Sequence, residues 1–152
     1  MVKYVKGNLL DSDCTYICHQ VNCQGRMYSG IAKQIRKRWP LVYQKYEYQC
    51  NTFSPEELLG TIDILKVDDK QTVVNIFGQS NYGYDGQRYT DYNAFRRALN
   101  IFSYLPAKGD SIGFPKNIGC GLGGGDWDVI SAMIEEILGK DFDVYIYELE
   151  DN

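Results

Sequence analysis

The stretch Lys116–Trp127, KNIGCGLGGGDW, sets the organisation of the whole chain. It follows a short apolar segment, Ser111–Phe114, that is typical of a strand, and it leads into an amphipathic helix expected to begin at Trp127. Its five glycines leave bare backbone amides in front of the positive end of that helix, an arrangement suited to phosphate. The alternative is a flexible glycine turn in which Asp126 caps the helix. The two interpretations are compatible.

A second glycine loop lies upstream, in the stretch Asn22–Gly30, NCQGRMYSG. An expected strand, Tyr16–Val21, precedes it, and an amphipathic helix follows it. The apolar stripe of that helix consists of Ile31, Ala32, Ile35 and Trp39. In α/β sheets, ligands bind beyond the carboxyl ends of the strands. The two glycine loops are therefore expected to face each other across one cleft, which suits a diphosphate.

The remaining sequence alternates between strand and helix patterns. Strands are expected at residues 2–6, 16–21, 61–67, 72–77, 111–114 and 143–149. Helices are expected at residues 31–39, 41–50, 92–104 and 127–138, with a short capped turn at 54–57. Several strands are apolar on both faces, which indicates a mixed sheet covered by helices on both sides. The sequence thus predicts an α/β fold and a single domain over residues 1–152.

Composition narrows the function classes. A chain of 152 residues with 44% hydrophobic content can bury a core without disulfides or metal. The net charge of −4 argues against broad nucleic-acid binding. The five cysteines form no CxxC pair and fit reduced thiols in the cytoplasm. With no signal peptide and no apolar run long enough to span a bilayer, no membrane association is expected.

Two residue groups remain without a firm role. The basic run Lys33, Arg36, Lys37 and Arg38 is interpreted as a solvated helix face. The thirteen tyrosines exceed what a core needs, and some of them are expected to stack on a ligand.

A zinc site is not expected, although Cys14, Cys18, His19 and Cys23 are close in sequence. Strand alternation points the adjacent residues Cys18 and His19 to opposite faces, so they do not converge easily on one ion. Neither a metal nor a cofactor is expected.

A dinucleotide-binding motif fits the glycine loop poorly. Gly119, Gly121 and Gly124 satisfy GxGxxG, and Glu148 stands roughly where an acidic ribose partner would be sought. That fold begins with the motif and needs several more βα units after it, whereas only 27 residues follow Gly125. A P-loop fails as well, because no Lys-Ser/Thr pair follows the glycines. An NAD-dependent oxidoreductase is therefore disfavoured.

Three motifs, in order, resemble those of a macrodomain across essentially the whole chain. They are Lys6-Gly7-Asn8-Leu9, HQVNCQG with Gly30-Ile31-Ala32, and Ile118-Gly119-Cys120-Gly121-Leu122 before a Trp-led helix. The resemblance implies a three-layer αβα fold with a mixed central sheet and an ADP-ribose cleft. Within macrodomains it is similar to the terminal ADP-ribose protein glycohydrolases and the ADP-ribose 1″-phosphate phosphatases, which share a histidine at the position of His19 and a GCGL-like loop.

The resemblance also implies ligand-binding roles. Asn8 and Leu9 would lie at the adenine, where many relatives carry Asp in place of Asn8, so that contact should be weaker. Asn22 would face the distal ribose. Tyr147 would either stack on the adenine or serve as an ordinary strand tyrosine. The diphosphate would be wrapped by the amides of Ser29, Gly30, Ile31, Gly119, Cys120, Gly121, Leu122 and Gly123.

The catalytic residues depart from the family pattern. The glycohydrolase branch uses a lysine nucleophile and an aspartate directly after GCGL, and these positions are Gly78 or Gln79 and Gly123 here, so a lysine adduct is not available. The candidate catalytic pair is His19, the single histidine, with Asp126. Together they would activate a water beside Asn22. The alternative for His19 is a buried histidine that ties strand to loop. Weaker candidates, Asp85 and Asp91, are interpreted as turn and helix-cap residues.

These observations predict an ADP-ribose-binding hydrolase that acts at the distal ribose. It would remove ADP-ribose from a modified protein or nucleic acid, or dephosphorylate ADP-ribose 1″-phosphate. The alternative is a module that only reads ADP-ribose. A monomer is expected.

Overall fold

The computed structural model describes residues 1–149 and contains a mixed six-stranded sheet in the order β1-β6-β5-β2-β4-β3. The antiparallel pairing of β3 with β4 makes the sheet mixed, because the other neighbouring strands are parallel. The strands lie within about two residues of their predicted positions. They are β1 (Val2–Lys6), β2 (Tyr16–Val21), β3 (Ile62–Lys66), β4 (Thr72–Phe77), β5 (Ser111–Pro115) and β6 (Asp143–Glu148).

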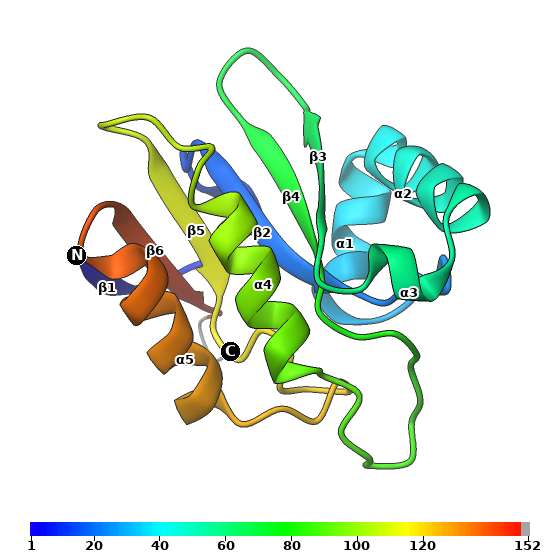
Figure 1. Cartoon of the computed structure of the whole chain (residues 1–152). Helices are drawn as coiled ribbons and strands as arrows, with labels where there is room; N and C mark the ends of the chain where they lie inside the picture. The colour runs from blue at the N-terminus through cyan, green and yellow to red at the C-terminus, as the bar shows by residue number, and fades with distance from the viewer. Residues whose placement is uncertain (150–152) are drawn as a thin grey trace.

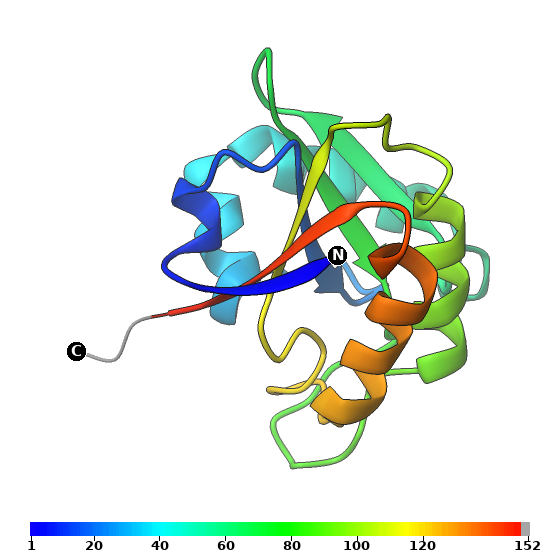
Figure 2. The same cartoon turned by 90° about the vertical axis from the view of Figure 1, so that its left-hand side faces the viewer.

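Helices cover both faces of the sheet (Figures 1 and 2). They are η1 (Leu9–Asp11), α1 (Gly30–Arg38), α2 (Pro40–Thr52), α3 (Pro55–Leu58), α4 (Tyr92–Phe102), α5 (Trp127–Ile134) and η2 (Glu135–Gly139). Strand alternation divides the core, since Cys18 packs with the residues of α4 and α5 whereas its neighbour Ile17 packs with those of α1 and α2. The predicted three-layer αβα arrangement is confirmed.

Local sequence signals explain where several helices begin. Pro40 opens α2, where its fixed backbone angle suits the first helical position. Ser54 and Glu57 form a reciprocal capping box at α3. Asp91 caps α4 by accepting a hydrogen bond from the amide of Ala94 at 3.0 Å, which confirms its interpretation as a cap residue.

The last helix differs from the single long helix that its apolar stripe predicts. Regular α-helix ends at Ile134 and continues as a π-helical turn, η2, through Gly139. The amino terminus of Met1 donates to the carbonyl oxygens of Gly139 and, at 2.8 Å, of Phe142. The end of this helix is thereby joined to the start of β1.

Both glycine loops lie at the same end of the sheet, beyond the carboxyl ends of the parallel strands. Strands β2 and β5 are parallel neighbours, and each glycine loop follows the carboxyl end of one of them. The loops lead into α1 and α5, which lie on opposite faces of the sheet (Figure 1). Among residues 1–149, no helix is long and apolar enough to cross a membrane.

Candidate functional site

Two connected hollows lie along this end of the sheet. The large hollow, of about 680 Å³, extends from the end of β1 to the glycine loop after β5. The small hollow, of about 120 Å³, lies between the loop after β2 and the tyrosine-rich loop at residues 78–91. The two share lining residues, so they form one cleft: Gln20, Ser29, Ala32, Gln79, Leu122 and Gly123.

Residues with unpaired backbone amides line both walls of the large hollow. Within residues 1–149, the amides of Gly119, Gly121, Leu122 and Gly123 donate to no backbone or side-chain oxygen. On the other wall, Ser29 and Gly30 begin α1, whose first-turn amides have no partner inside the helix. Free amides at the positive end of a helix attract anions. The arrangement therefore offers a site for two linked phosphoryl groups.

Cys120 does not belong to this set, contrary to prediction. Its amide donates to the carbonyl of Asn117 at 2.8 Å, and its thiol is placed to donate to the carbonyl of Ile118 at 3.3 Å. The side chain packs partly into the core, and burial raises the pKa of the thiol to about 11. The tight turn after Asn117, which has a positive φ of 66°, points Cys120 inward.

The glycines of this loop have different surroundings. A side chain at Gly121 would meet no heavy atom within 4 Å, because this position faces the large hollow. A side chain at Gly123 would come within 2.7 Å of the Gly119 carbonyl and of the Thr90 hydroxyl. The loop thus has room for a side chain at Gly121 but none at Gly123.

A neutral hydrogen-bond network joins the two hollows. The side-chain amide of Gln20 donates to Gln79 Oε1 at 2.7 Å and to Thr90 Oγ1 at 2.9 Å. Thr90 in turn donates to the carbonyl of Gly119 at 2.6 Å. The sequence did not predict Gln20 as a cleft residue, nor Thr90 as the buried residue that holds Gln20 and the carbonyl of Gly119. Strand alternation gave a signal for Gln20, whereas the path of the loop that carries Thr90 follows no pattern.

Asn22 lines the small hollow, and its contact with the distal ribose stays a prediction. Its Oδ1 accepts from the amide of Gln24 and the hydroxyl of Tyr46, both at 2.9 Å. Its Nδ2 donates to the carbonyl of Arg26 at 3.0 Å, which leaves a second N–H for a ligand. Asn22 therefore anchors the loop and keeps one side-chain N–H without a protein partner among the described residues, at the wall of the small hollow.

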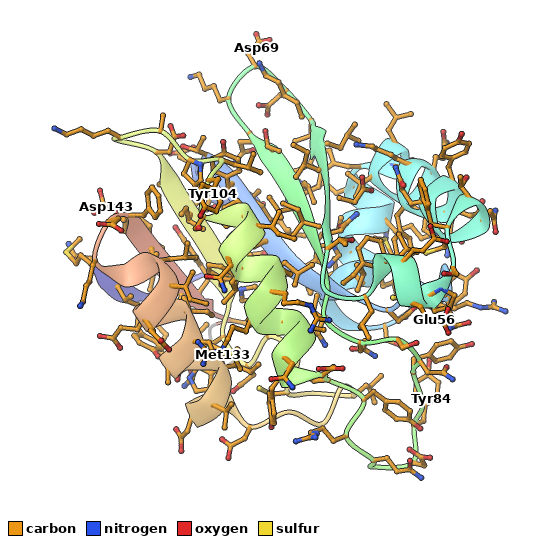
Figure 3. All side chains as sticks on the ribbon, viewed as in Figure 1. Glu56, Asp69, Tyr84, Tyr104, Met133 and Asp143 are labelled. Carbon is orange, nitrogen blue, oxygen red and sulfur yellow. The ribbon has the colours of Figure 1, made fainter. Side chains whose placement is uncertain are left out.

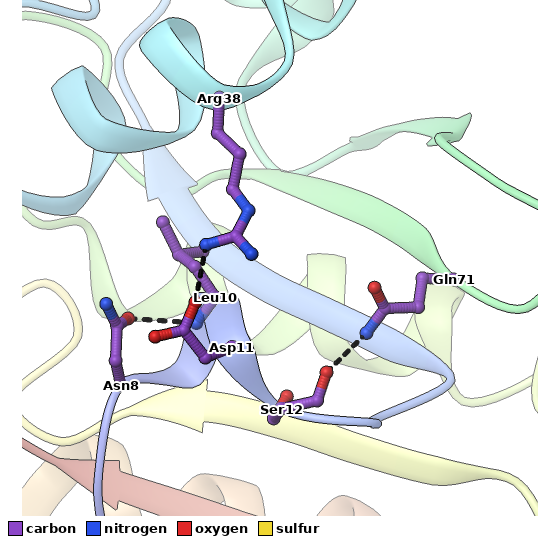
Figure 4. Close-up of polar contacts among 6 residues, drawn as sticks. All are labelled: Asn8, Leu10, Asp11, Ser12, Arg38 and Gln71. Carbon is purple, nitrogen blue, oxygen red and sulfur yellow. Dashed lines mark hydrogen bonds and ion pairs between the residues drawn. The ribbon is translucent and has the colours of Figure 1, made fainter.

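The far end of the large hollow is lined by Asn8, Leu9 and Tyr147. Asn8 Oδ1 accepts from the amide of Leu10 at 3.0 Å and so caps η1 (Figure 4). One lone pair of Oδ1 and both N–H groups remain for a ligand. The side chain of Leu9 is buried against Gly113, so Leu9 offers the hollow mainly its backbone. Stacking on Tyr147 stays a prediction.

The geometry does not support a catalytic pair of His19 and Asp126. His19 is fully buried on the face covered by α1 and α2, where its Nε2 lies 2.5 Å from Asn75 Oδ1. Asp126 stands on the opposite face, at the start of α5, and accepts from the amide of Asp128 at 2.8 Å. Neither residue lines the cleft. Strand alternation and the start of α5 place the two groups on opposite faces of the sheet, so the catalytic pair stays a prediction without geometric support.

Comparison with known protein families matches residues 18–146 to the Macro domain. The chain belongs to the Macro domain family.

Curated relatives of this macrodomain carry two activity names. A Mycobacterium tuberculosis protein named DNA ADP-ribosyl glycohydrolase is 28% identical over 97% of this chain and 42% of its own length. The chain thus spans less than half of that relative. A Lodderomyces elongisporus protein named ADP-ribose 1″-phosphate phosphatase is 27% identical over 97% of this chain and 99% of its own. The macrodomain of Mycobacterium tuberculosis DarG has the same fold, with a TM-score of 0.82, 23% identity and 97% coverage of both chains.

The positions that hold lysine and aspartate in the glycohydrolase branch are filled differently in this macrodomain. At Gly78, a side chain would come within 2.2 Å of Gln20 Oε1. Gln79 is tied to Gln20 and, through its Nε2, to the carbonyl of Asn81 at 2.8 Å. There is no room for a side chain at Gly123 either. A packed network of neutral groups therefore stands where the glycohydrolase branch has its lysine and aspartate. In the described part of the chain, no cluster of His, Cys, Asp and Glu could hold a metal ion.

Asp126→Ala is expected to lower stability and to leave activity nearly unchanged, because its carboxylate caps α5. Loss of such a cap costs about 0.5–2 kcal/mol. Thermal melts measured beside turnover assays test this expectation, with Asp126→Asn as a control that keeps a capping oxygen. A large loss of turnover with unchanged stability would restore a catalytic role for Asp126.

His19 is expected to make the macrodomain less stable as the solution becomes acidic. Burial lowers the pKa of His19 from its ordinary value of 6.5 to about 4. Between pH 6.5 and pH 4 the unfolded chain binds a proton at His19, whereas the folded chain does not. The free energy of unfolding is therefore highest above pH 6.5 and falls as the pH drops towards 4, by up to about 3 kcal/mol. Urea unfolding of the wild type and His19→Gln at several pH values measures the difference. Parallel losses in both proteins would contradict the expectation.

Proposed function

We propose that this macrodomain binds ADP-ribose in its cleft and hydrolyses the bond at C1″ of the distal ribose. The observation that carries the proposal is the pair of facing walls of free amides, from Gly119–Gly123 and from the start of α1. Backbone amides in this arrangement suit a diphosphate. The names of the relatives support the same ligand and both versions of the reaction.

In this proposal the adenosine occupies the large hollow beside Asn8 and Tyr147. The diphosphate passes between the two walls of amides, and the distal ribose enters the small hollow next to Asn22. The cleft has the right order of parts for such an extended ligand, because Gln20, Ser29 and Gly123 line both hollows.

Two groups of the small hollow suit hydrolysis at C1″. The free N–H of Asn22 would hold a hydroxyl of the ribose in position. The guanidinium of Arg26 would neutralise the negative charge of a departing phosphate or other anionic group. The transition state of such a cleavage resembles an oxocarbenium ion, so stabilising the departing anion lowers its energy.

The second candidate function is a reader that binds ADP-ribose without cleaving it. One observation favours it: among the described residues, those lining the small hollow include no carboxylate, lysine or histidine. General acid–base catalysis by a side chain would then lack its usual groups.

One experiment separates the two functions. The protein is incubated separately with ADP-ribosylated protein, ADP-ribosylated DNA and ADP-ribose 1″-phosphate, and free ADP-ribose is measured. Release from any substrate supports the hydrolase and identifies the bond. Absence of release, together with ADP-ribose binding by calorimetry, supports the reader, and absence of binding rejects both. A cytoplasmic monomer stays part of this proposal.

A further inference from the structure

Tyrosine and arginine side chains, four of them exposed and two half-buried, gather around the mouth of the small hollow. This tyrosine–arginine surface consists of Arg26, Tyr28, Arg36, Tyr43, Tyr82 and Tyr84, from the loop after β2, from α1 and α2, and from the loop at residues 78–91. Three of its tyrosines stay open to solvent, with exposed fractions of 45% for Tyr28, 37% for Tyr82 and 70% for Tyr84. A cluster of exposed rings beside a cleft is typical of a binding surface.

The arginines hold part of this surface in place. The guanidinium carbon of Arg36 lies 4.6 Å from the ring centre of Tyr28 and 4.0 Å from that of Tyr43, so it joins the two rings. Arg26 lies 5.5 Å from the ring of Tyr28. On the other side of the mouth, the hydroxyl of Tyr84 is 3.2 Å from the hydroxyl of Ser29. Side chains fixed in this way lose little entropy when a partner binds.

The charge of this surface is positive although the whole chain carries −4. Within residues 1–149, neither Arg26 nor Arg36 forms an ion pair with a carboxylate. Lys33 and Lys37 extend the positive charge along α1. The carboxylates that hydrogen-bond here are Glu47, which accepts from the hydroxyl of Tyr43, and Asp85, which accepts from that of Tyr89. The surface thus presents open rings next to cations.

We propose that the tyrosine–arginine surface binds single-stranded nucleic acid, with bases stacked on the open tyrosines and phosphates beside the arginines. Unpaired bases expose faces that stack on aromatic rings, whereas a duplex hides them. An acidic peptide would match the charge but would gain no stacking. This inference rests on the proposed function, because it names the class of substrate that carries the ADP-ribose into the small hollow.

The test measures binding of an unmodified, fluorescently labelled oligonucleotide of about 12 nucleotides by anisotropy. Deoxyribose and ribose versions are compared, and a preference for either supports the proposal and identifies the source. Tyr82→Ala and Tyr84→Ala are each expected to weaken binding by at least about fivefold. Tyr84→Phe keeps the ring and is expected to retain most of the affinity. Arg26→Ala is expected to remove about one phosphate contact, so the slope of log affinity against log salt concentration should fall by about 1.

Matched controls come from the segment between α4 and β5, where Tyr104 is 89% exposed and lies away from Tyr84 (Figure 3). Tyr104→Ala and Lys108→Ala are expected to bind the oligonucleotide as the wild type does. The proposal is overturned if the wild type does not bind, if Tyr82→Ala with Tyr84→Ala has no effect, or if a duplex or a polyglutamate peptide binds equally well. Calorimetry with free ADP-ribose tests the cleft separately, so failure of either proposal is recognised without the other.

Discussion

Gly121→Glu is expected to abolish binding of ADP-ribose while the fold survives. The loop tolerates the new side chain, because a Cβ at Gly121 meets no heavy atom within 4 Å and the residue has no positive φ. The carboxylate would lie where we place the diphosphate. Two like charges about 4 Å apart repel by about 4 kcal/mol at an effective dielectric constant of 20, which corresponds to about a thousandfold weaker binding.

Isothermal calorimetry with ADP-ribose measures this loss, and circular dichroism shows whether the variant is folded. Ala107→Glu is the matched control, because it adds the same charge to an exposed turn outside the cleft. Unchanged affinity in folded Gly121→Glu would show that the diphosphate does not pass this loop.

Asn22→Ala is expected to lower turnover by on the order of a hundredfold on whichever substrate the wild type cleaves. The change removes the donor facing the small hollow and also the acceptor that holds the amide of Gln24 and the hydroxyl of Tyr46. Binding of ADP-ribose should change much less, because the backbone amides that we assign to the diphosphate remain. Separate measurement of kcat and of ADP-ribose affinity therefore tests the assignment.

Tyr46→Phe is the graded control for Asn22. It removes the hydroxyl that donates to the backbone oxygen of Asn22 at 2.6 Å and to its Oδ1, but leaves the side-chain amide in the cleft. We expect a stability loss of about 1–3 kcal/mol from the unpaired buried oxygen, with a smaller loss of turnover than in Asn22→Ala. Equal kcat losses in the two variants would assign Asn22 a structural role only.

The fold was largely predictable from the sequence because its signals are local. Short runs of mostly apolar residues between turns define Tyr16–Val21 and Thr72–Phe77 as strands buried on both faces, and a glycine loop followed by an amphipathic helix marks each wall of the cleft. Parallel strands bring such loops to one edge of the sheet whatever the details of packing. The family motifs lie on these same elements, so the macrodomain fold followed from the same residues.

Residue roles were less predictable, because they depend on which way a side chain or an amide points. Cys120 stands between two glycines whose amides are free, yet its own amide closes a turn onto Asn117. His19 and Asp126 are separated by the sheet itself, a relation that spacing along the chain does not encode. The contact of Gln20 with Thr90 joins residues that are 70 positions apart, so no local pattern announces it.

The position of β1 in the sheet has a consequence for synthesis on the ribosome. β1 is a strand at the edge of the sheet and pairs with β6, so that Val2 lies opposite Val144. Of the strands described here, β1 is synthesised first and β6 last, so β1 must wait for β6 before it gains its ladder of hydrogen bonds. At about 5–20 residues per second this interval is on the order of ten seconds. During that time β1 stays open to chaperones or to wrong partners, and β5, once it is synthesised, also keeps its edge open until β6 arrives.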